Sequence, residues 1–276
     1  MRLVNDSGRL ALVVGDRVAD VKQASKGRFS PDPDAVFPRW TEFREWAATV
    51  TSGTKPLADV NLKAPVPQPR QLFAVGLNYR AHAEETDTAT PDEPLVFAKF
   101  PSCLTGPDAD ITVAGRSIDW EAELVVVMAV GGRGIPAERA WDCVAGLTVG
   151  QDLSERVDQA RGPVPQWSMA KSHEKFGPTG PTLVTPDEVD NPAKLEIRCT
   201  IGGEVVQQGN TAQMIHPVPQ LIEWISHRVK LFPGDLIFTG TPAGVGMGRN
   251  PPRYLCPGDV LVTEIGGLGR IEQRFR

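Results

Sequence analysis

Two carboxylates, Glu121 and Glu123, interrupt an otherwise apolar run of the chain. The run reads I-D-W-E-A-E-L-V-V-V-M at residues 118–128, and its β-branched and bulky residues predict a strand. Alternate side chains of a strand share a face, so the two carboxylates would point the same way, about 7 Å apart. A buried carboxylate without a partner takes up a proton, pairs with a cation or binds a metal ion. The alternative is a strand end at which both acids face water.

A third candidate acid, Asp152, lies in the stretch T-V-G-Q-D-L-S-E-R-V-D-Q at 148–159. The spacing of Asp152, Arg156 and Gln159 by four and then three residues would put them on one face of a helix. Three carboxylates offer only hard oxygen ligands, which favour Mg²⁺, Mn²⁺ or Ca²⁺ over Zn²⁺ and leave positions for water or substrate. The alternative is a helix start at which acidic and basic side chains simply pair.

A histidine and a glutamate three residues apart form the next candidate pair, in G-L-N-Y-R-A-H-A-E-E-T at 76–86. We expect Asn78 to cap a short helix on which His82 and Glu85 share a face. In such a dyad the carboxylate orients the imidazole and raises its basicity, and the imidazole removes a proton from water. The alternative is a solvated helix face with a local contact.

Other catalytic motifs are absent from the sequence. The glycine-rich stretch F-T-G-T-P-A-G-V-G-M-G at 238–248 has no G-K-[ST], and the prolines that follow it exclude the helix needed by a phosphate loop. We expect a loop at a strand end, in which Thr239 and Thr241 make turn bonds or face a site. Neither G-x-S-x-G nor H-E-x-x-H occurs. His216 and His227 are expected to be structural or exposed.

The elements that must position these residues are mostly strands. Only two later segments, 137–144 and 219–229, read as helices, the second through an apolar stripe. This pattern predicts an α+β fold with a mostly β core. The expected strands are 72–75, 95–97, 124–130, 195–201, 236–239 and 260–265.

The first part of the chain reads as a separate module. Two short alternating runs, at 10–14 and 18–21, precede a helical stretch at 37–50. The segment L-K-A-P-V-P-Q-P-R at 62–70 is too rich in proline for a helix or a central strand and indicates a boundary. We therefore expect a small N-terminal α/β domain at 1–65 and a catalytic domain at 66–276.

The composition favours small-molecule chemistry. The chain has 276 residues, 41% of them hydrophobic, and a formal net charge of −5 without a basic run, so we expect no binding to nucleic acid or to an anionic membrane. Four cysteines without a C-x-x-C pair indicate reduced thiols. No apolar stretch reaches membrane-spanning length, and the N-terminus lacks a secretory apolar region, so a cytoplasmic protein is expected.

These motifs, in this order, resemble the fumarylacetoacetate hydrolase family. The similarity covers about residues 70–276, and its most specific parts are the E-x-E, the D-x-x-x-R that follows and T-G-T-P-x-G-V-G. It implies a mixed β-sandwich roll, a small N-terminal domain and a homodimer. The matching blocks are G-L-N-Y-R-A-H-A-E-E, F-A-K-F-P-S, D-W-E-A-E-L-V-V-V, A-G-L-T-V-G-Q-D-L-S-E-R, A-K-S-H-E-K-F-G-P-T-G-P and P-G-D-L-I-F-T-G-T-P-A-G-V-G.

The resemblance also implies roles for individual residues. It implies a divalent metal ion, Mg²⁺ or else Mn²⁺ or Ca²⁺, held by Glu121, Glu123 and Asp152. His82 and Glu85 match a water-activating dyad on a mobile lid, and Lys171 matches an active-site lysine. The residues that match positions lining the substrate pocket are Arg156, Gln159 and Thr241.

The chain departs from the family pattern at two places. K-S-H-E at 171–174 stands where relatives commonly have K-S-F-D, and I-G-G-E at 201–204 replaces V-N-G-E. These changes alter side chains that could form part of the pocket wall. We expect His173 to pack rather than to enter the site, and the effect of Glu174 stays open.

The residues and the resemblance together suggest a reaction. A 1,3-diketo or 2-oxo acid would chelate the metal ion, Lys171 and Arg156 would attract its charge, and water activated by the His82–Glu85 dyad would cleave a carbon–carbon bond to release a metal-held enolate. We therefore expect an acylpyruvate-type hydrolase. The alternatives are an oxaloacetate-type decarboxylase, a 2-hydroxydienoate keto–enol isomerase, or a non-catalytic metal-binding protein.

Overall fold

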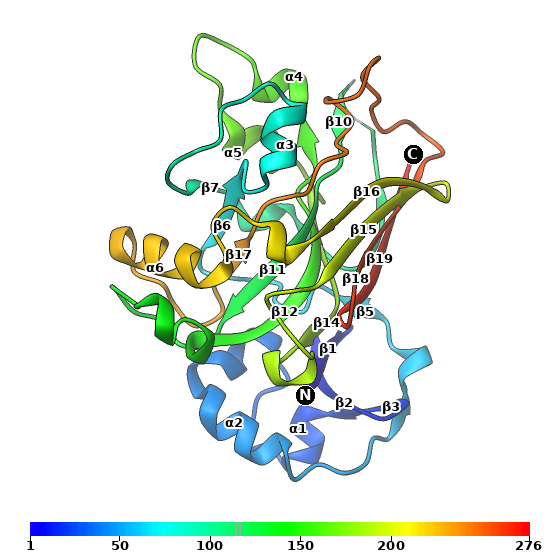
Figure 1. Ribbon diagram of the computed structural model, residues 1–276. Coiled ribbons are helices and arrows are strands. Elements are labelled where there is room, and N and C mark those ends of the chain that lie inside the picture. The colour runs from blue at the N-terminus through cyan, green and yellow to red at the C-terminus, as the bar shows by residue number, and fades with distance from the viewer. Residues whose placement is uncertain (114, 116) are drawn as a thin grey trace.

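The fold is built from two β-sheets and a short ribbon, with few helices (Figure 1). A computed structural model describes residues 1–113, 115 and 117–276. Over these residues, sheet outweighs helix, which confirms the expected α+β, mostly β class. In the larger sheet the order is β4-β3-β2-β1-β14-β12-β11-β17-β6-β7, with β5 on β1 and β8 on β14. Its strands are β1 (Arg2–Asp6), β2 (Arg9–Val14), β3 (Arg17–Asp20), β4 (Lys55–Pro56), β5 (Leu62–Lys63), β6 (Leu72–Gly76), β7 (Leu95–Ala98), β8 (Leu104–Thr105), β11 (Ala122–Met128), β12 (Val144–Gln151), β14 (Gly177–Val184) and β17 (Leu236–Phe238).

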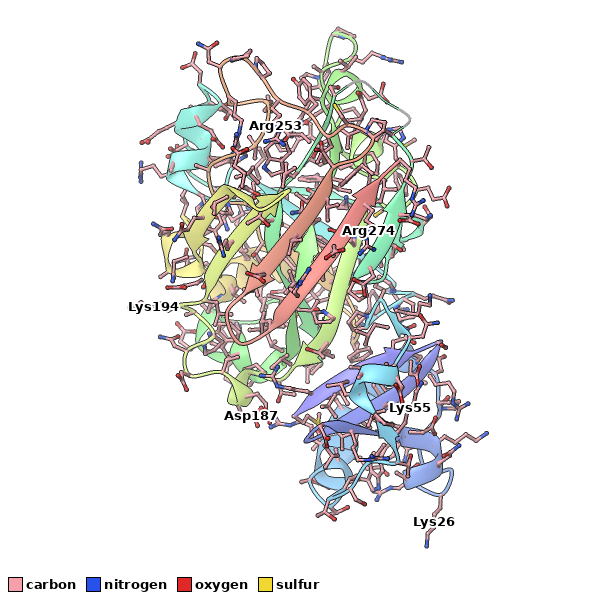
Figure 2. The ribbon with its side chains drawn as sticks, turned by 90° about the vertical axis from the view of Figure 1, so that its right-hand side faces the viewer. Lys26, Lys55, Asp187, Lys194, Arg253 and Arg274 are labelled. Atoms are coloured by element: carbon pink, nitrogen blue, oxygen red, sulfur yellow. The ribbon has the colours of Figure 1, made fainter. Side chains whose placement is uncertain are left out.

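The second sheet has the order β16-β15-β18-β19-β9 and faces the viewer in Figure 2. It packs on the large sheet, and Gln151 Nε2 donates across the interface to Thr263 Oγ1 at 2.7 Å. The strands of this sheet and of the ribbon are β9 (Asp108–Ile111), β15 (Glu196–Ile201), β16 (Glu204–Asn210), β18 (Val260–Ile265), β19 (Gly269–Phe275), β10 (Ile118–Asp119) and β13 (Ser154–Glu155). The helices are α1 (Val21–Ala24), α2 (Trp40–Ala47), α3 (Arg80–Glu85), α4 (Arg156–Gln159), α5 (Trp167–Ala170) and α6 (Val218–Arg228).

Two strand pairings bring distant acids together. All seven residues of β11 are buried, and β11 pairs antiparallel with β12 with Ala122 opposite Gln151. This register places the residues that follow β12 beside those at the start of β11. In the ribbon, β10 pairs antiparallel with β13, with Asp119 opposite Ser154. The segment that leads into β11 therefore runs beside the segment that leads into α4.

The N-terminal elements continue the large sheet. Strand β1 pairs with β14 through Arg2 and Val184, and an ion pair of 3.4 Å joins Arg44 on α2 to Asp187. Figure 2 shows this part, with Lys26 and Lys55, below the body of the molecule. An aromatic cluster fills its core, formed by Phe29, Phe37, Trp40, Phe43 and Trp46. The division into domains at 1–65 and 66–276 stays a prediction.

Three local predictions are wrong. Asp152, Arg156 and Gln159 do not share a helix face, because Asp152 directly follows β12 and α4 begins only at Arg156. Residues 137–144 form no α-helix but two 3₁₀ turns, η4 (Ala137–Arg139) and η5 (Trp141–Cys143), because the chain must already enter β12 at Val144. Asn78 does not cap α3, since its amide bonds the carbonyls of His216 and Thr239 instead. The second predicted helix is confirmed as α6. Within the described ranges, none of the helices is long and apolar enough to cross a bilayer.

Candidate metal centre and active site

Three buried carboxylates converge where β11 begins and β12 ends. Each of Glu121, Glu123 and Asp152 offers an oxygen that lies within 4.8 Å of the other two. Lys171 Nζ lies 2.7 Å from Glu121 Oε2 and 3.0 Å from Asp152 Oδ2, and it donates to Ser154 Oγ at 2.7 Å. The structure thus brings the three predicted ligands and the predicted lysine together.

The three carboxylates have different electrostatic surroundings. Burial raises the pKa of Glu121, but the charges of Lys171 and Arg156 outweigh it and hold that pKa at about 2. The pKa of Glu123 is raised well above its usual range by burial and then by the charges of Asp152 and Glu121. Glu123 accepts a hydrogen bond from Gly240 N at 2.8 Å, and no cation contacts it among the described residues.

The charge balance of this cluster fits a divalent cation. Three mutually close carboxylates and a fourth, joined to them through an arginine, face three cationic side chains, so one negative charge stays uncompensated over the described part of the chain. A dication would turn this deficit into a single positive charge, which an anionic substrate could neutralise. Hard oxygen donors are the ligands that Mg²⁺ and Mn²⁺ prefer. The groups are Asp119, Glu121, Glu123 and Asp152 on one side and Lys99, Arg156 and Lys171 on the other.

Lys99, which follows β7, is a residue of this site that sequence reasoning missed. Its side chain is fully buried, and Nζ lies 2.6 Å from Asp152 Oδ1. The same ammonium bonds the backbone carbonyls of Lys171 and Phe176. Lys99 therefore holds one predicted metal ligand and the backbone of the predicted lysine in a fixed relation. The available signal was a lysine inside the apolar stretch F-A-K-F.

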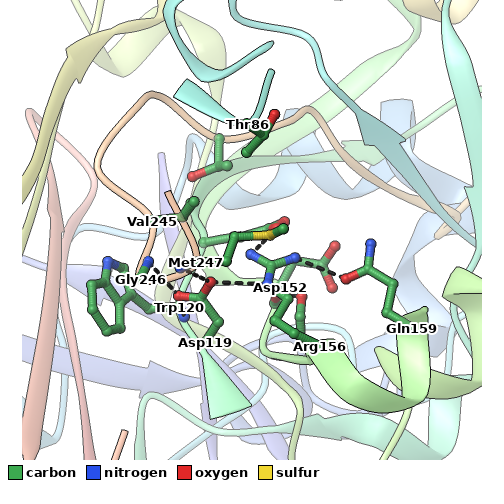
Figure 3. Close-up of polar contacts among 12 residues, drawn as sticks. Thr86, Asp119, Trp120, Asp152, Arg156, Gln159, Val245, Gly246 and Met247 are labelled. Atoms are coloured by element: carbon green, nitrogen blue, oxygen red, sulfur yellow. Dashed lines mark hydrogen bonds and ion pairs between the residues drawn. The ribbon is translucent and has the colours of Figure 1, made fainter. Parts of the chain in front are cut away.

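Asp119 is the second missed residue, and it positions Arg156. In Figure 3 the Asp119 carboxylate lies between the guanidinium of Arg156 and the backbone of residues 246–247. Arg156 Nε donates to Asp119 Oδ2 at 2.9 Å, and Nη1 donates to Gln159 Oε1 at 2.9 Å. Arg156 Nη2 lies 2.8 Å from Glu121 Oε1, in an ion pair that lacks hydrogen-bond geometry. That nitrogen is thus a buried donor whose hydrogen-bonding capacity is unused among the described residues.

The predicted dyad forms on α3. His82 Nδ1 and Glu85 Oε1 lie 2.8 Å apart, and the imidazole is buried. Glu85 Oε2 also accepts a hydrogen bond from Gly244 N at 2.7 Å. Because a carboxylate accepts at Nδ1–H, the neutral ring presents Nε2 as its proton acceptor.

One cavity is lined both by His82 of the dyad and by Glu121 of the carboxylate cluster. It has a volume of about 170 Å³ and takes in His82, Glu121, Arg156, Gln159 and Lys171. Thr241 also lines it, and its hydroxyl donates to the carbonyl of Ala122 at 2.9 Å. Thr241 thus lies in the pocket wall, and its hydroxyl bonds a distant strand instead of making the local turn bond that was the alternative. The other lining residues are Val75, Gly76, Leu77, Thr86, Thr88, Trp167 and Met247.

His173 lies outside this cavity. It lines a separate cleft of about 480 Å³ with Glu174 and other charged residues. Its Nε2 is 3.3 Å from Asp158 Oδ2, and its ring packs 5.0 Å from that of Phe176. His173 therefore lies outside the active-site cavity, as expected, and the departure from the family pattern at residues 173–174 falls on this second cleft.

The loop that holds Asp119 depends on a glycine. A Cβ at Gly246 would lie 1.9 Å from the carbonyl oxygen of Arg253 and 2.8 Å from Asp119 Oδ1. We expect Gly246→Ala to lower the free energy of unfolding by about 1–3 kcal/mol, because backbone must move to admit the methyl group. Chemical denaturation measures this. The matched control is Gly132→Ala, whose Cβ would meet nothing nearer than 3.7 Å. An equal loss of unfolding free energy in the two variants would contradict a steric requirement for glycine at position 246.

Sequence comparison decides the family. The family described as "Fumarylacetoacetate (FAA) hydrolase C-terminal" matches residues 71–276. The chain belongs to this family. The fumarylacetoacetate hydrolase family resemblance inferred from the motifs is therefore confirmed.

Individual family members extend the comparison. The chain is 44% identical over 218 residues to the human protein "Oxaloacetate tautomerase FAHD2A, mitochondrial", which covers 78% of this chain and 69% of the relative. A Mycobacterium smegmatis protein provisionally named HpcE has a crystal structure that matches 100% of this chain and 99% of its own, with 53% identity and a TM-score of 0.97. Maleylpyruvate hydrolase from Sphingobium sp. SYK-6 was solved with manganese(II) and pyruvate. Its structure matches 100% of this chain and 98% of its own, with 29% identity and a TM-score of 0.81.

These relatives correct one prediction and support another in part. The expected cytoplasmic location is wrong on this comparison, since the human relative is named as a mitochondrial protein. Several relatives are named as enzymes, among them an oxaloacetate tautomerase and a maleylpyruvate hydrolase, so the chain is an enzyme of the fumarylacetoacetate hydrolase family.

Proposed function

We propose that this protein is a divalent-metal-dependent enzyme that interconverts the keto and enol forms of a small 2-oxo acid of the oxaloacetate type. The observation that carries the proposal is a small cavity lined by the imidazole of His82, the guanidinium of Arg156 and Glu121, which is one of the three clustered carboxylates. Its volume of about 170 Å³ is well below that of sites for drug-sized ligands, which favours a short substrate. The 44% identity to an oxaloacetate tautomerase supports the same reaction.

The metal would be held by Glu121, Glu123 and Asp152. When bound, a divalent ion such as Mg²⁺ or Mn²⁺ supplies a Lewis acid that polarises the 2-oxo group. The manganese(II) in the similar maleylpyruvate hydrolase structure supports this choice of ion. Lys99 keeps Asp152 in place, through a contact of 2.6 Å, so that the donors are arranged before an ion arrives.

The remaining steps belong to side chains of the cavity. Arg156 would bind a substrate carboxylate through Nη2, which has hydrogen-bonding capacity to spare. His82 would remove a proton from the carbon next to the oxo group through Nε2 and deliver it to the oxo oxygen, which gives the enol; the reverse transfer gives the keto form. Glu85 holds the ring during both transfers. Lys171 lines the same cavity and would stabilise the negative charge that develops on the substrate oxygen.

Hydrolysis of an acylpyruvate is the second candidate. The same His82–Glu85 dyad could remove a proton from water instead of carbon, and the similarity to a maleylpyruvate hydrolase favours this reaction. Decarboxylation of an oxo acid requires the same stabilised enolate. The three reactions differ in the bond that is broken, so they are separated by their products.

We expect the metal-loaded protein to accelerate keto–enol exchange of oxaloacetate more than it accelerates cleavage of an acylpyruvate or release of CO₂. The measurements are enol absorbance, acylpyruvate consumption and CO₂ evolution under one metal ion, with chelator-treated protein as the control. Acylpyruvate cleavage with oxaloacetate exchange at its spontaneous rate would favour the hydrolase. Full activity after chelator treatment would contradict a metal-dependent reaction. Assembly as a homodimer also stays a prediction, which analytical ultracentrifugation tests.

A further inference from the structure

Trp167 is the one Trp, Tyr or Phe side chain among the described residues that line the active-site cavity. It opens α5, and its backbone carbonyl accepts a hydrogen bond from Lys171 N at 3.0 Å. The two residues are therefore one helical turn apart, and both contribute side chains to the same cavity. A rigid indole thus stands beside the lysine that contacts Glu121 and Asp152.

The indole is held in place from two sides. A Cβ built on Gly76, at the end of β6, would lie 2.2 Å from Trp167 Cζ3, so the ring occupies the space that any other side chain would need. The ring of Phe97 on β7 meets the indole edge to face, with centroids 5.4 Å apart and planes at 84°. Contact with Gly76 on one side and with the perpendicular ring of Phe97 on the other holds the indole in one position.

The other walls of the cavity are smaller or more mobile side chains. Thr86 follows the α3 helix, and Met247 belongs to the loop bonded by Asp119, with 40% of its side chain exposed. A flexible thioether can move aside for a ligand, whereas a clamped indole cannot. The length available to a substrate is therefore limited most strongly at Trp167.

We propose that Trp167 is a specificity-determining residue that restricts the enzyme to short 2-oxo acids without a bulky group at the distal end. The proposal rests on the proposed function for the identity of the chelating end, and it adds the substrate class that the far wall admits. Removing the indole enlarges a cavity of only about 170 Å³ by a volume of the same order. A longer acyl chain or an aromatic ring would then find room.

The first test measures binding, so that it does not depend on which reaction the enzyme catalyses. Mn²⁺-loaded wild-type protein and Trp167→Ala are titrated calorimetrically with oxalate, which has no distal chain, and with benzoylpyruvate, which carries a phenyl ring. We expect the affinity for oxalate to change by less than about threefold and the affinity for benzoylpyruvate to rise by about tenfold or more in the variant. The matched control is Trp224→Ala, which removes a half-buried indole on α6 outside the cavity.

A second test examines the contact itself by thermal unfolding. Gly76→Ala is expected to destabilise the wild-type protein and to be tolerated in the Trp167→Ala background, because the methyl group would enter the space vacated by the ring. Trp167→Leu serves if the alanine variant does not fold. An unchanged preference for oxalate over benzoylpyruvate in a folded Trp167 variant overturns the proposal. Weak oxalate binding by every variant, wild type included, overturns the proposed function instead.

Discussion

Replacing His82 with asparagine is expected to lower kcat by about 10²- to 10⁴-fold, the usual contribution of a general base. The imidazole is buried in the cavity, and Glu85 holds its Nδ1 at 2.8 Å. Asparagine keeps a polar side chain near Glu85 but supplies no group that accepts a proton near neutral pH. Steady-state kinetics on the substrate identified above measures the loss.

The effect should be confined to the chemical step. Metal affinity should stay within about threefold of wild type, because His82 is not among the three clustered carboxylates, and the variant should keep a cooperative thermal transition. His227→Asn is the matched control, since this histidine is exposed on α6 and its Nδ1 contacts the carbonyl of Glu223. Wild-type turnover by His82→Asn would remove the dyad from the mechanism.

Replacing Glu123 with glutamine is expected to weaken binding of Mn²⁺ or Mg²⁺ by at least about 100-fold. Changes in residues that merely support a metal ligand cost 10- to 100-fold, so loss of a ligand charge should cost at least as much. Glutamine keeps the acceptor for Gly240 N and nearly the same shape. Isothermal titration calorimetry measures the affinity, and Glu45→Gln on the exposed face of α2 controls for loss of one surface charge.

The same substitution should stabilise the metal-free protein. Burial and neighbouring carboxylates raise the pKa of Glu123 in the folded protein above its value in the unfolded chain. At neutral pH, where the unfolded chain has this group ionised, the raised pKa lowers the free energy of unfolding. Each unit of such a rise corresponds to about 1.4 kcal/mol. Denaturation in the presence of chelator should therefore show a higher midpoint for Glu123→Gln. A lower midpoint together with unchanged metal affinity would mean that Glu123 is a structural acid.

Local spacing singled out the two glutamates and the dyad as candidates, but the family resemblance was needed to choose between their alternative roles. Glu121 and Glu123 were predicted from two charges inside a buried strand, and the spacing of His82 and Glu85 predicted a contact within one helical turn. Placing Asp152 beside the two glutamates required knowledge that β11 pairs with β12. The sequence implies that pairing only through the family resemblance. Periodicity reports which residues share a face, but it does not report which faces meet.

The missed residues act through contacts between distant segments. Lys99 reaches Asp152 across 53 positions, and Asp119 reaches Arg156 across 37. The wrong cap at Asn78 has the same origin, because its amide finds partners 138 and 161 positions away. A local motif competes with such partners only after the chain has folded, so side-chain preference alone could not decide these cases.

The carboxylate of Glu85 is shared, through one oxygen with the imidazole of His82 and through the other with the backbone of Gly244. An outward movement of helix α3 would break the hydrogen bond from Gly244 N, whereas the contact between His82 and Glu85 lies within the helix and would move with it. The internal geometry of the dyad is therefore independent of the seating of the helix, and only its position in the cavity depends on that seating. If α3 moves, the base leaves the cavity already assembled, so the dyad does not have to form again when the helix returns.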